Sequence, residues 1–211
     1  MKRRFSTVLL ALAALFVLLT CPLRGAAAAD QRDILVLGDS LSAGYGLDAG
    51  VGWVSLLQRR LHQQGYRYQV TNASVSGDTT SGGLQRLPQA LEQHRPAVLI
   101  IELGGNDGLR GTPLQVMRGN LRRLVELGRN AGARVLLLGV RLPPNYGPAY
   151  TDAFEKVYTQ VAHETHTPLV PRLLEGVATK RALMQADGIH PKADAQQQLL
   201  DNVWPALKPL L

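Results

Sequence analysis

Ser40 is a candidate nucleophile. A serine hydroxyl attacks a carbonyl group only when a base removes its proton, so a hydrolytic serine needs a histidine and a group that orients it. Ser40 follows Gly38-Asp39, directly after the apolar run Asp33–Leu37. The segment Gly38–Ser42 contains only half of the G-x-S-x-G pattern of nucleophile elbows, because the second glycine is absent. Ser40 is therefore either a nucleophile or the cap of the turn that follows it.

His190 is the histidine whose setting best suits a general base. It lies in Asp187-Gly188-Ile189-His190-Pro191, where glycine and proline predict a loop before the last helix. In such a loop the Asp187 carboxylate can accept a hydrogen bond from Nδ1–H of His190, which leaves Nε2 to take the serine proton. The alternative is that Asp187 and His190 are only helix-entry residues. The other histidines fall in or beside polar helix faces, where a solvated position is expected: His62, His94, His163 and His166.

Two glycine-containing segments are candidates for binding the negatively charged oxygen that forms during ester hydrolysis. Asn72–Thr79 contains Gly77, which lets a backbone N–H approach a ligand without a Cβ in the way. Gly104-Gly105-Asn106-Asp107 contributes the amide of Asn106, a neutral donor of two protons. With the backbone N–H of Ser40, these groups could make three donors around one point. Each segment taken alone is also compatible with a simple turn.

The elements that must position these residues alternate between short apolar runs and amphipathic segments. Strands are predicted at Asp33–Leu37, Tyr68–Ala73, Ala97–Leu103, Arg134–Gly139 and Pro168–Val170. Helices are predicted at Trp53–Gln64, at Gly82–His94 with a break or restart at Pro88, from Thr112 as N-cap to Gly132, around Phe154–Ala162, and from near Pro191 to Leu207. This alternation predicts a parallel sheet covered on both faces, with functional groups at the carboxyl ends of the strands.

Four blocks of the sequence, taken together and in order, resemble those that define the SGNH (GDSL) hydrolases. They are Gly38-Asp39-Ser40-Leu41, Gly77 within Asn72–Thr79, Gly104-Gly105-Asn106-Asp107, and Asp187-Gly188-Ile189-His190-Pro191. The resemblance runs from about Ile34 to Leu207. It implies a three-layer α/β/α flavodoxin-like fold with a central, mostly parallel five-stranded sheet. It also implies Ser40, Asp187 and His190 as a catalytic triad, with Ser40, Gly77 and Asn106 as the oxyanion hole.

Three longer segments are similar to the multifunctional periplasmic acyl-CoA thioesterases, arylesterases and lysophospholipases of Gram-negative bacteria: Leu37–Tyr45, Glu102–Gly111 and Arg141–Gly147. This similarity implies hydrolysis of acyl esters and thioesters through an acyl-serine intermediate. It further implies a mobile loop around Gly108–Pro113 and a substrate contact at Leu109. Two alternatives stay open, namely a carbohydrate acetyl esterase on the same fold and a lipid- or glycan-binding module with an inactive site.

Residues 1–29 have the composition of a secretory signal. Lys2, Arg3 and Arg4 precede an apolar run from Val8 to Leu19, and an A-x-A cleavage site ends at Ala29. The run is short for a transmembrane helix, which needs roughly 20 apolar residues. We expect export to the periplasm of a single hydrolase domain over residues 30–211. An uncleaved anchor and a lipoprotein site at Cys21 are the alternatives.

The remaining composition excludes several classes of function. The net charge of +7 falls to +3 without the four basic residues of the signal, and no lysine-rich run suggests a nucleic-acid partner. Cys21 lies inside the signal, so the exported chain has no thiol chemistry or disulfide. Gly44–Ala49 fits G-x-G-x-x-A but begins well after the first strand, which argues against a nicotinamide cofactor. We expect no cofactor or metal, and a monomer with no stable membrane span after signal cleavage, acting on a small acyl ester or thioester with at most transient lipid contact.

Overall fold

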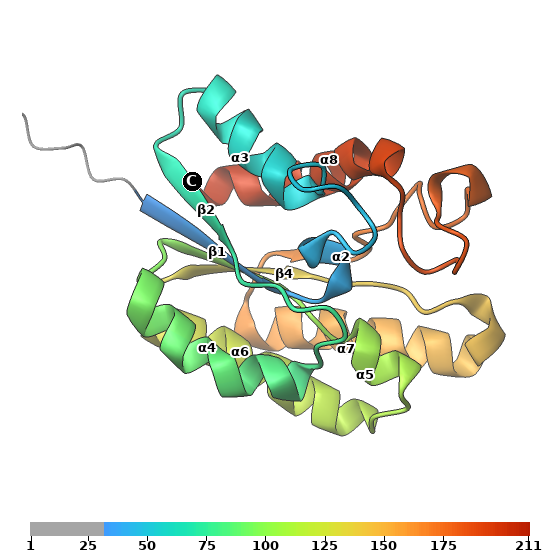
Figure 1. Ribbon diagram of the computed structural model, residues 1–211. Helices are drawn as coiled ribbons and strands as arrows, with labels where there is room; N and C mark the ends of the chain where they lie inside the picture. Colours follow the sequence, from blue (N-terminus) through green and yellow to red (C-terminus); the bar gives the residue numbers. More distant parts are fainter. Residues whose placement is uncertain (1–31) are drawn as a thin grey trace, which may run out of the picture. The chain divides into compact units, whose positions relative to one another are not determined.

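Five parallel strands form the central sheet of the chain in the computed structural model, which describes residues 32–211 (Figure 1). The predicted signal segment 1–29 lies outside the described residues. The strands are β1 (Arg32–Gly38), β2 (Tyr68–Asn72), β3 (Val98–Glu102), β4 (Arg134–Leu138) and β5 (Leu169–Val170). Their order is β2-β1-β3-β4-β5, with Ile34 of β1 opposite Val70 on one side and Val98 on the other. This is the doubly wound order of flavodoxin-like folds, as predicted.

Helices cover both faces of this sheet (Figure 1). On one face α3 (Trp53–Gln63) packs against α8 (Gln196–Leu207), and on the other α6 (Leu114–Asn130) packs between α4 (Thr80–His94) and α7 (Pro148–Thr165). The short helices α2 (Ser40–Ala43) and α5 (Gly105–Leu109) follow β1 and β3 directly. Single 3₁₀ turns complete the chain at Pro144–Tyr146, Arg181–Leu183, Ala193–Ala195 and Lys208–Leu210.

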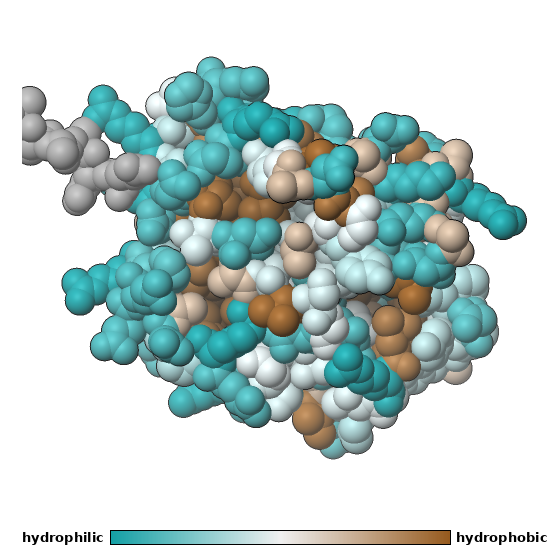
Figure 2. All heavy atoms as spheres, viewed as in Figure 1, coloured by the Kyte–Doolittle hydropathy of each residue, from teal (hydrophilic) through white to brown (hydrophobic). Residues whose placement is uncertain are grey.

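The core lies between these layers. The central strands β1 and β3 are covered on both faces, and therefore they are apolar almost without interruption rather than alternating. Each covering helix turns one apolar stripe inward, such as Trp53, Leu57 and Leu61 on α3. On the face shown in Figure 2, polar residues dominate the surface and hydrophobic residues emerge only in small patches between them. Within residues 32–211, none of the helices has the length and apolar content that crossing a bilayer requires.

Three predicted helix details are wrong. The helix α4 runs through Pro88 without a break, because Pro88 lies on its exposed side, where the carbonyl that loses its helical donor can meet water. The helix α6 is capped by Pro113 instead of Thr112, since the N–H of Thr112 donates to the Asp107 carbonyl in the preceding turn. The last helix begins at Gln196, because Pro191 is held extended by a β-bridge to Met184.

Candidate active site

Ser40 lies at the point where β1 ends and α2 begins. The N-cap of α2 is Asp39, whose Oδ1 accepts a hydrogen bond from the N–H of Leu41 at 3.0 Å. Asp39 therefore does the capping that the sequence left open for Ser40, and the interpretation of Ser40 as the cap is wrong. The Ser40 hydroxyl is free to face the cavity that lies beyond the carboxyl ends of the strands.

Asp187 and His190 lie next to Ser40 although 150 positions separate Ser40 from His190. Nε2 of His190 is 2.8 Å from Oγ of Ser40, and Nδ1 of His190 is 2.7 Å from Oδ2 of Asp187. Both residues precede α8 by several positions, so they are not helix-entry residues. The ring of Tyr45 packs on the imidazole with the centroids 4.5 Å apart, and the side chain of Gln185 donates to the Tyr45 carbonyl at 2.9 Å.

The Asp187 carboxylate is strongly favoured in its ionised form. Its Oδ1 accepts hydrogen bonds from the backbone N–H groups of His190 at 3.0 Å and Ile189 at 2.9 Å. The hydrogen bond from the His190 backbone is the largest cause that lowers the pKa of Asp187 from its ordinary value to about 2. The carboxylate is consequently charged at every pH at which the protein is expected to work, and it can hold the imidazole in one orientation.

Gly77 and Asn106 reach the same cavity as Ser40 from two other loops. Gly77 has φ 80°, a left-handed conformation that glycine adopts without strain, and its carbonyl accepts from Arg110 at 2.9 Å. Asn106 lies in α5, and its Nδ2 donates to Oδ2 of Asp39 at 3.0 Å. The sheet thus brings together Ser40, Gly77, Asn106 and His190 at one cavity, with Asp187 behind His190.

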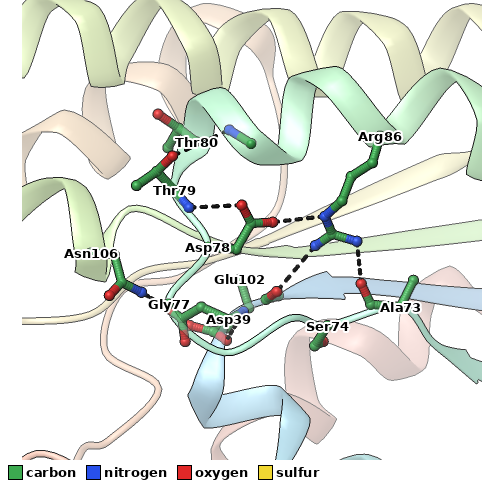
Figure 3. Close-up of polar contacts among 12 residues, drawn as sticks. Asp39, Ala73, Ser74, Gly77, Asp78, Thr79, Thr80, Arg86, Glu102 and Asn106 are labelled. Carbon is green, nitrogen blue, oxygen red and sulfur yellow. Dashed lines mark hydrogen bonds and ion pairs between the residues drawn. The ribbon is translucent and has the colours of Figure 1, made fainter.

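Arg86 of α4 ties these loops together, and nothing in the sequence pattern singled it out. Its guanidinium donates to Oδ2 of Asp78 at 2.7 Å, to the Gly38 carbonyl at 3.3 Å and to the Ala73 carbonyl. Figure 3 shows it reaching toward Asp78 and Ala73. Gly38 ends β1 just before Ser40, whereas Ala73 and Asp78 flank Gly77. One side chain therefore fixes the distance between the strand that carries Ser40 and the loop that carries Gly77.

A second tie joins the loop of Asn106 to the start of α4. The buried carboxylate of Asp107 accepts from the backbone N–H of Thr80 at 2.8 Å and from its hydroxyl at 2.6 Å. On the opposite side of α5, the hydroxyl of Tyr150 donates to the Gly108 carbonyl at 3.2 Å. The short helix that carries Asn106 is thereby held from α4 and from α7.

The cavity beside Ser40 has a volume of about 600 Å³. Leu109 lines it, and Gly108 and Leu109 form the last turn of α5. The substrate contact at Leu109 and the mobility of the loop Gly108–Pro113 stay predictions. The wall away from the polar groups is mostly apolar and includes Leu109, Val140, Leu142, Leu174 and Met184. Such a lining suits an acyl chain better than a polyol.

A pair of buried carboxyl groups lies behind the site and was also missed. Asp39 is 2% exposed, and Glu102, the last residue of β3, is fully buried. A glutamate inside the apolar run Ala97–Leu103 was a visible signal, because a buried carboxyl group is costly unless it is partnered.

The sequence of the chain matches the model of the GDSL-like lipase/acylhydrolase family over residues 36–198. The chain belongs to this family. Among the relatives of this acylhydrolase, "Esterase TesA" of Pseudomonas aeruginosa is 56% identical over 183 residues, which cover 87% of the chain and 91% of the relative. The protein named "Thioesterase 1/protease 1/lysophospholipase L1" of Escherichia coli is 46% identical over 186 residues, which cover 88% and 87%.

A solved structure supports the same assignment. The crystal structure of a protein named TesA superimposes on this acylhydrolase with a TM-score of 0.84 at 57% sequence identity, and the match covers 85% of the chain and all of that structure. The acylhydrolase therefore shares its fold with a close relative over nearly all of its described residues.

Proposed function

We propose that this acylhydrolase cleaves acyl esters and thioesters, among them aryl esters, lysophospholipids and acyl-CoA, through an acyl-Ser40 intermediate. One observation carries the proposal: Oγ of Ser40 lies 2.8 Å from Nε2 of His190 at the wall of a largely apolar cavity. Membership of the family makes the chain an ester hydrolase. The names of its relatives favour acyl substrates of more than one kind.

The reaction we propose has two halves. His190 takes the proton of Ser40 through Nε2 while Oγ bonds to the acyl carbon, and then gives this proton to the departing alkoxide or thiolate. A water molecule next attacks the acyl-serine with His190 again as the base, which releases the acid and restores Ser40. Asp187 fixes the tautomer of His190 and stabilises the imidazolium that forms in each half.

The oxyanion of each tetrahedral intermediate would accept hydrogen bonds from the backbone N–H groups of Ser40 and Gly77 and from Nδ2 of Asn106. Asn106 has one N–H engaged with Asp39 and a second N–H left for the oxyanion. Such donors act mainly in the transition state, because the charge on the oxygen develops there.

Replacement of single groups tests these roles on p-nitrophenyl esters. We expect Ser40→Ala to abolish both turnover and labelling by a fluorophosphonate probe, and loss of His190 to be as severe, because the two act as a unit. Asn106→Ala should lower kcat by about 10²–10³ with little change in KM. Normal hydrolysis by Asn106→Ala would show that the oxyanion assignment is wrong, and an unlabelled native Ser40 would favour a binding module.

Substrate class is tested with p-nitrophenyl acetate and decanoate, a lysophospholipid and acetylated xylan. The apolar wall of the cavity favours the decanoate and the lysophospholipid. Activity on the acetylated xylan alone would instead support a carbohydrate esterase.

We also propose that residues 1–29 export the protein to the periplasm and are then removed, leaving a domain of residues 30–211. The charged start, apolar run and A-x-A site support this. Mass spectrometry of protein from the periplasmic fraction of a Gram-negative host would locate the new N-terminus. An intact chain in the membrane fraction would indicate an uncleaved anchor.

A further inference from the structure

The buried carboxyl groups of Asp39 and Glu102 form a pair with one unexplained oxygen (Figure 3). The backbone N–H of Asp39 donates to Glu102, which brings the two carboxyl groups side by side. On Asp39, Oδ1 accepts from the Leu41 N–H at 3.0 Å and Oδ2 accepts from Asn106 at 3.0 Å. On Glu102, Oε2 accepts from the hydroxyl of Ser42 at 2.8 Å and from the backbone N–H of Asp39 at 3.3 Å.

The fourth oxygen, Oε1 of Glu102, is fully buried and has no hydrogen-bond partner among the described residues. A buried polar atom left without a partner costs about 1–3 kcal/mol, so such an atom calls for an explanation. A carboxyl oxygen that carries a proton is a donor, and a donor next to the Asp39 carboxylate would be satisfied at once.

Electrostatics also favours a proton on Glu102 and a negative charge on Asp39. Two buried carboxylates in contact cannot both be ionised, because each charge opposes the other. Burial is the largest cause that raises the pKa of Glu102 well above its ordinary value, and the charge of Asp39 adds to it. Asp39 is also raised in pKa by burial, but hydrogen bonds from Leu41 and Asn106 and the nearby His190 act against this. Tyr158, which also faces the pair, is buried and has a raised pKa.

We propose that Glu102 carries a proton on Oε1 and donates it to Asp39, and that this proton keeps Asp39 an acceptor that orients the amide of Asn106. Both carboxyl groups are then positioning residues. The proposal rests on the proposed role of Asn106 as an oxyanion donor.

The orientation of Asn106 is where the pair would matter for the reaction. An acceptor at Asp39 Oδ2 holds the NH₂ group of Asn106 toward itself and turns the second N–H toward the cavity. If the proton moved onto Asp39 Oδ2, the amide could turn its carbonyl oxygen to Asp39. The N–H of Asn106 would then no longer be held toward the oxyanion, and kcat would fall without a change in substrate binding.

Comparison of Glu102→Leu with Glu102→Gln distinguishes a role as proton donor from a role in packing alone. Glu102→Leu removes the proton donor, and we expect kcat to fall by at least about tenfold and at most by the factor of Asn106→Ala, with KM unchanged. Gln has the shape of a protonated Glu and donates through its NH₂ group, so Glu102→Gln should recover most of the lost rate. Glu126→Gln, on the exposed surface of α6, is the matched control.

The double variant Glu102→Leu/Asn106→Ala identifies the path of the effect. If Glu102 acts through Asn106, the double variant should have the kcat of Asn106→Ala within about twofold, since non-additivity marks residues that act as a unit. Multiplied losses, with Asn106→Ala itself impaired, would overturn the proposal and leave the proposed function intact. Normal activity of Asn106→Ala would instead overturn the proposed role of Asn106.

Infrared spectroscopy reads the proton directly and does not depend on activity. The difference spectrum of wild type minus Glu102→Gln at pH 7 should contain the C=O band of a protonated carboxylic acid. The corresponding difference spectrum for Glu126→Gln should contain the bands of a carboxylate and no band of a protonated carboxylic acid. A carboxylate band in place of the acid band for Glu102 would overturn the proposal, even if Glu102→Leu failed to fold.

Discussion

Two aspartates of this site occupy opposite environments. Asp187 has a side chain that is 38% exposed and accepts three hydrogen bonds, whereas Asp39 is buried against a second carboxyl group. The first environment favours the ionised form and the second opposes it, so the pKa values of the two aspartates move in opposite directions. In the proposed mechanism, residues of one type therefore serve two purposes. Asp187 stabilises the imidazolium that forms at His190, and Asp39 orients the neutral amide of Asn106.

The lowered pKa of Asp187 predicts a specific dependence of stability on pH. Because the folded value is about 2 and the ordinary value is 3.8, the ionised carboxylate stabilises the fold above about pH 4. This contribution should be lost as the pH falls from about 4 toward 2. We expect the difference in Tm between wild type and Asp187→Asn to shrink between pH 5 and pH 2.5. Asp194→Asn, an exposed neighbour, is the control, and a difference that is constant with pH would contradict the prediction.

At the scale of the elements, side chains from the helices hold the loops that end the strands. Arg86 of α4 joins the end of β1 to the loop of Gly77, and Asp107 joins α5 to the start of α4. These contacts come from behind the site, away from the cavity. The geometry at Ser40 is therefore decided in part by residues that do not touch a substrate.

Arg86→Met should change catalysis more than binding. It removes hydrogen bonds to Gly38 and Asp78 and leaves the partly buried Asp78 without its cation. We expect kcat to fall by about tenfold or more while KM changes little, because the Gly77 loop is displaced from where the oxyanion forms. Arg86→Lys should recover only part of this rate, since lysine lacks the planar fork. Arg122→Met on the exposed side of α6 is the control. Equal kcat values for Arg86→Met and Arg122→Met would contradict the role of Arg86.

Gly104 makes the tight connection between β3 and α5. Its φ is 116°, and an added Cβ would lie 2.5 Å from the Tyr158 hydroxyl and 2.6 Å from Cε of Met117. Gly104→Ala should lower the free energy of unfolding by at least about 2 kcal/mol in urea titrations, from strain and overpacking together. Gly119→Ala in α6 meets nothing within 4 Å and should stabilise by up to about 1 kcal/mol. Equal stability of the two variants would contradict this account.

The pattern of the sequence was enough to predict the alternation of elements but not their junctions. Apolar runs predicted all five strands to within about two residues, because central strands are buried on both faces. Pro88 was misjudged since its effect depends on which face of α4 meets water, which only packing decides. The blocks around Ser40 and His190 were visible because loop chemistry is local. Arg86 was not, because its acceptors lie 8 to 48 residues away in the chain.

At the scale of the whole molecule, the cavity draws its walls from segments far apart in the sequence. Leu109 comes from α5, Val140 and Leu142 follow β4, and Leu174 and Met184 lie in the long connection after β5. The polar groups stand at one side and the apolar wall at the other. The space beside Ser40 is therefore bounded by segments that follow β3, β4 and β5, whereas the polar groups come from the ends of β1, β2 and β3 and from the connection after β5.

Ala178→Trp should narrow the range of acyl chains that the enzyme accepts. Ala178 lines the cavity and is partly open to solvent, so the larger ring can be accommodated without repacking the core. We expect kcat/KM for p-nitrophenyl decanoate to fall by about tenfold or more, because apolar contact area is lost, while the value for the acetate stays near that of wild type. Ala182→Trp, exposed and away from the cavity lining, is the control. Equal falls in kcat/KM for the decanoate and the acetate would indicate that the acyl chain does not bind beside Ala178.

The loop that bears Asp187 and His190 closes on itself. The N–H of Gln185 donates to the His190 carbonyl at 2.7 Å, and Met184 forms a β-bridge with Pro191. Asp187 and His190 therefore lie on one short loop whose two ends are held together. These contacts lie within residues 184–191, so they do not depend on the length of the chain before Met184. An insertion or deletion between Leu174 and Met184 would therefore change the cavity wall and leave the hydrogen bonds around His190 in place. Part of the cavity wall and the position of His190 therefore depend on different stretches of one connection.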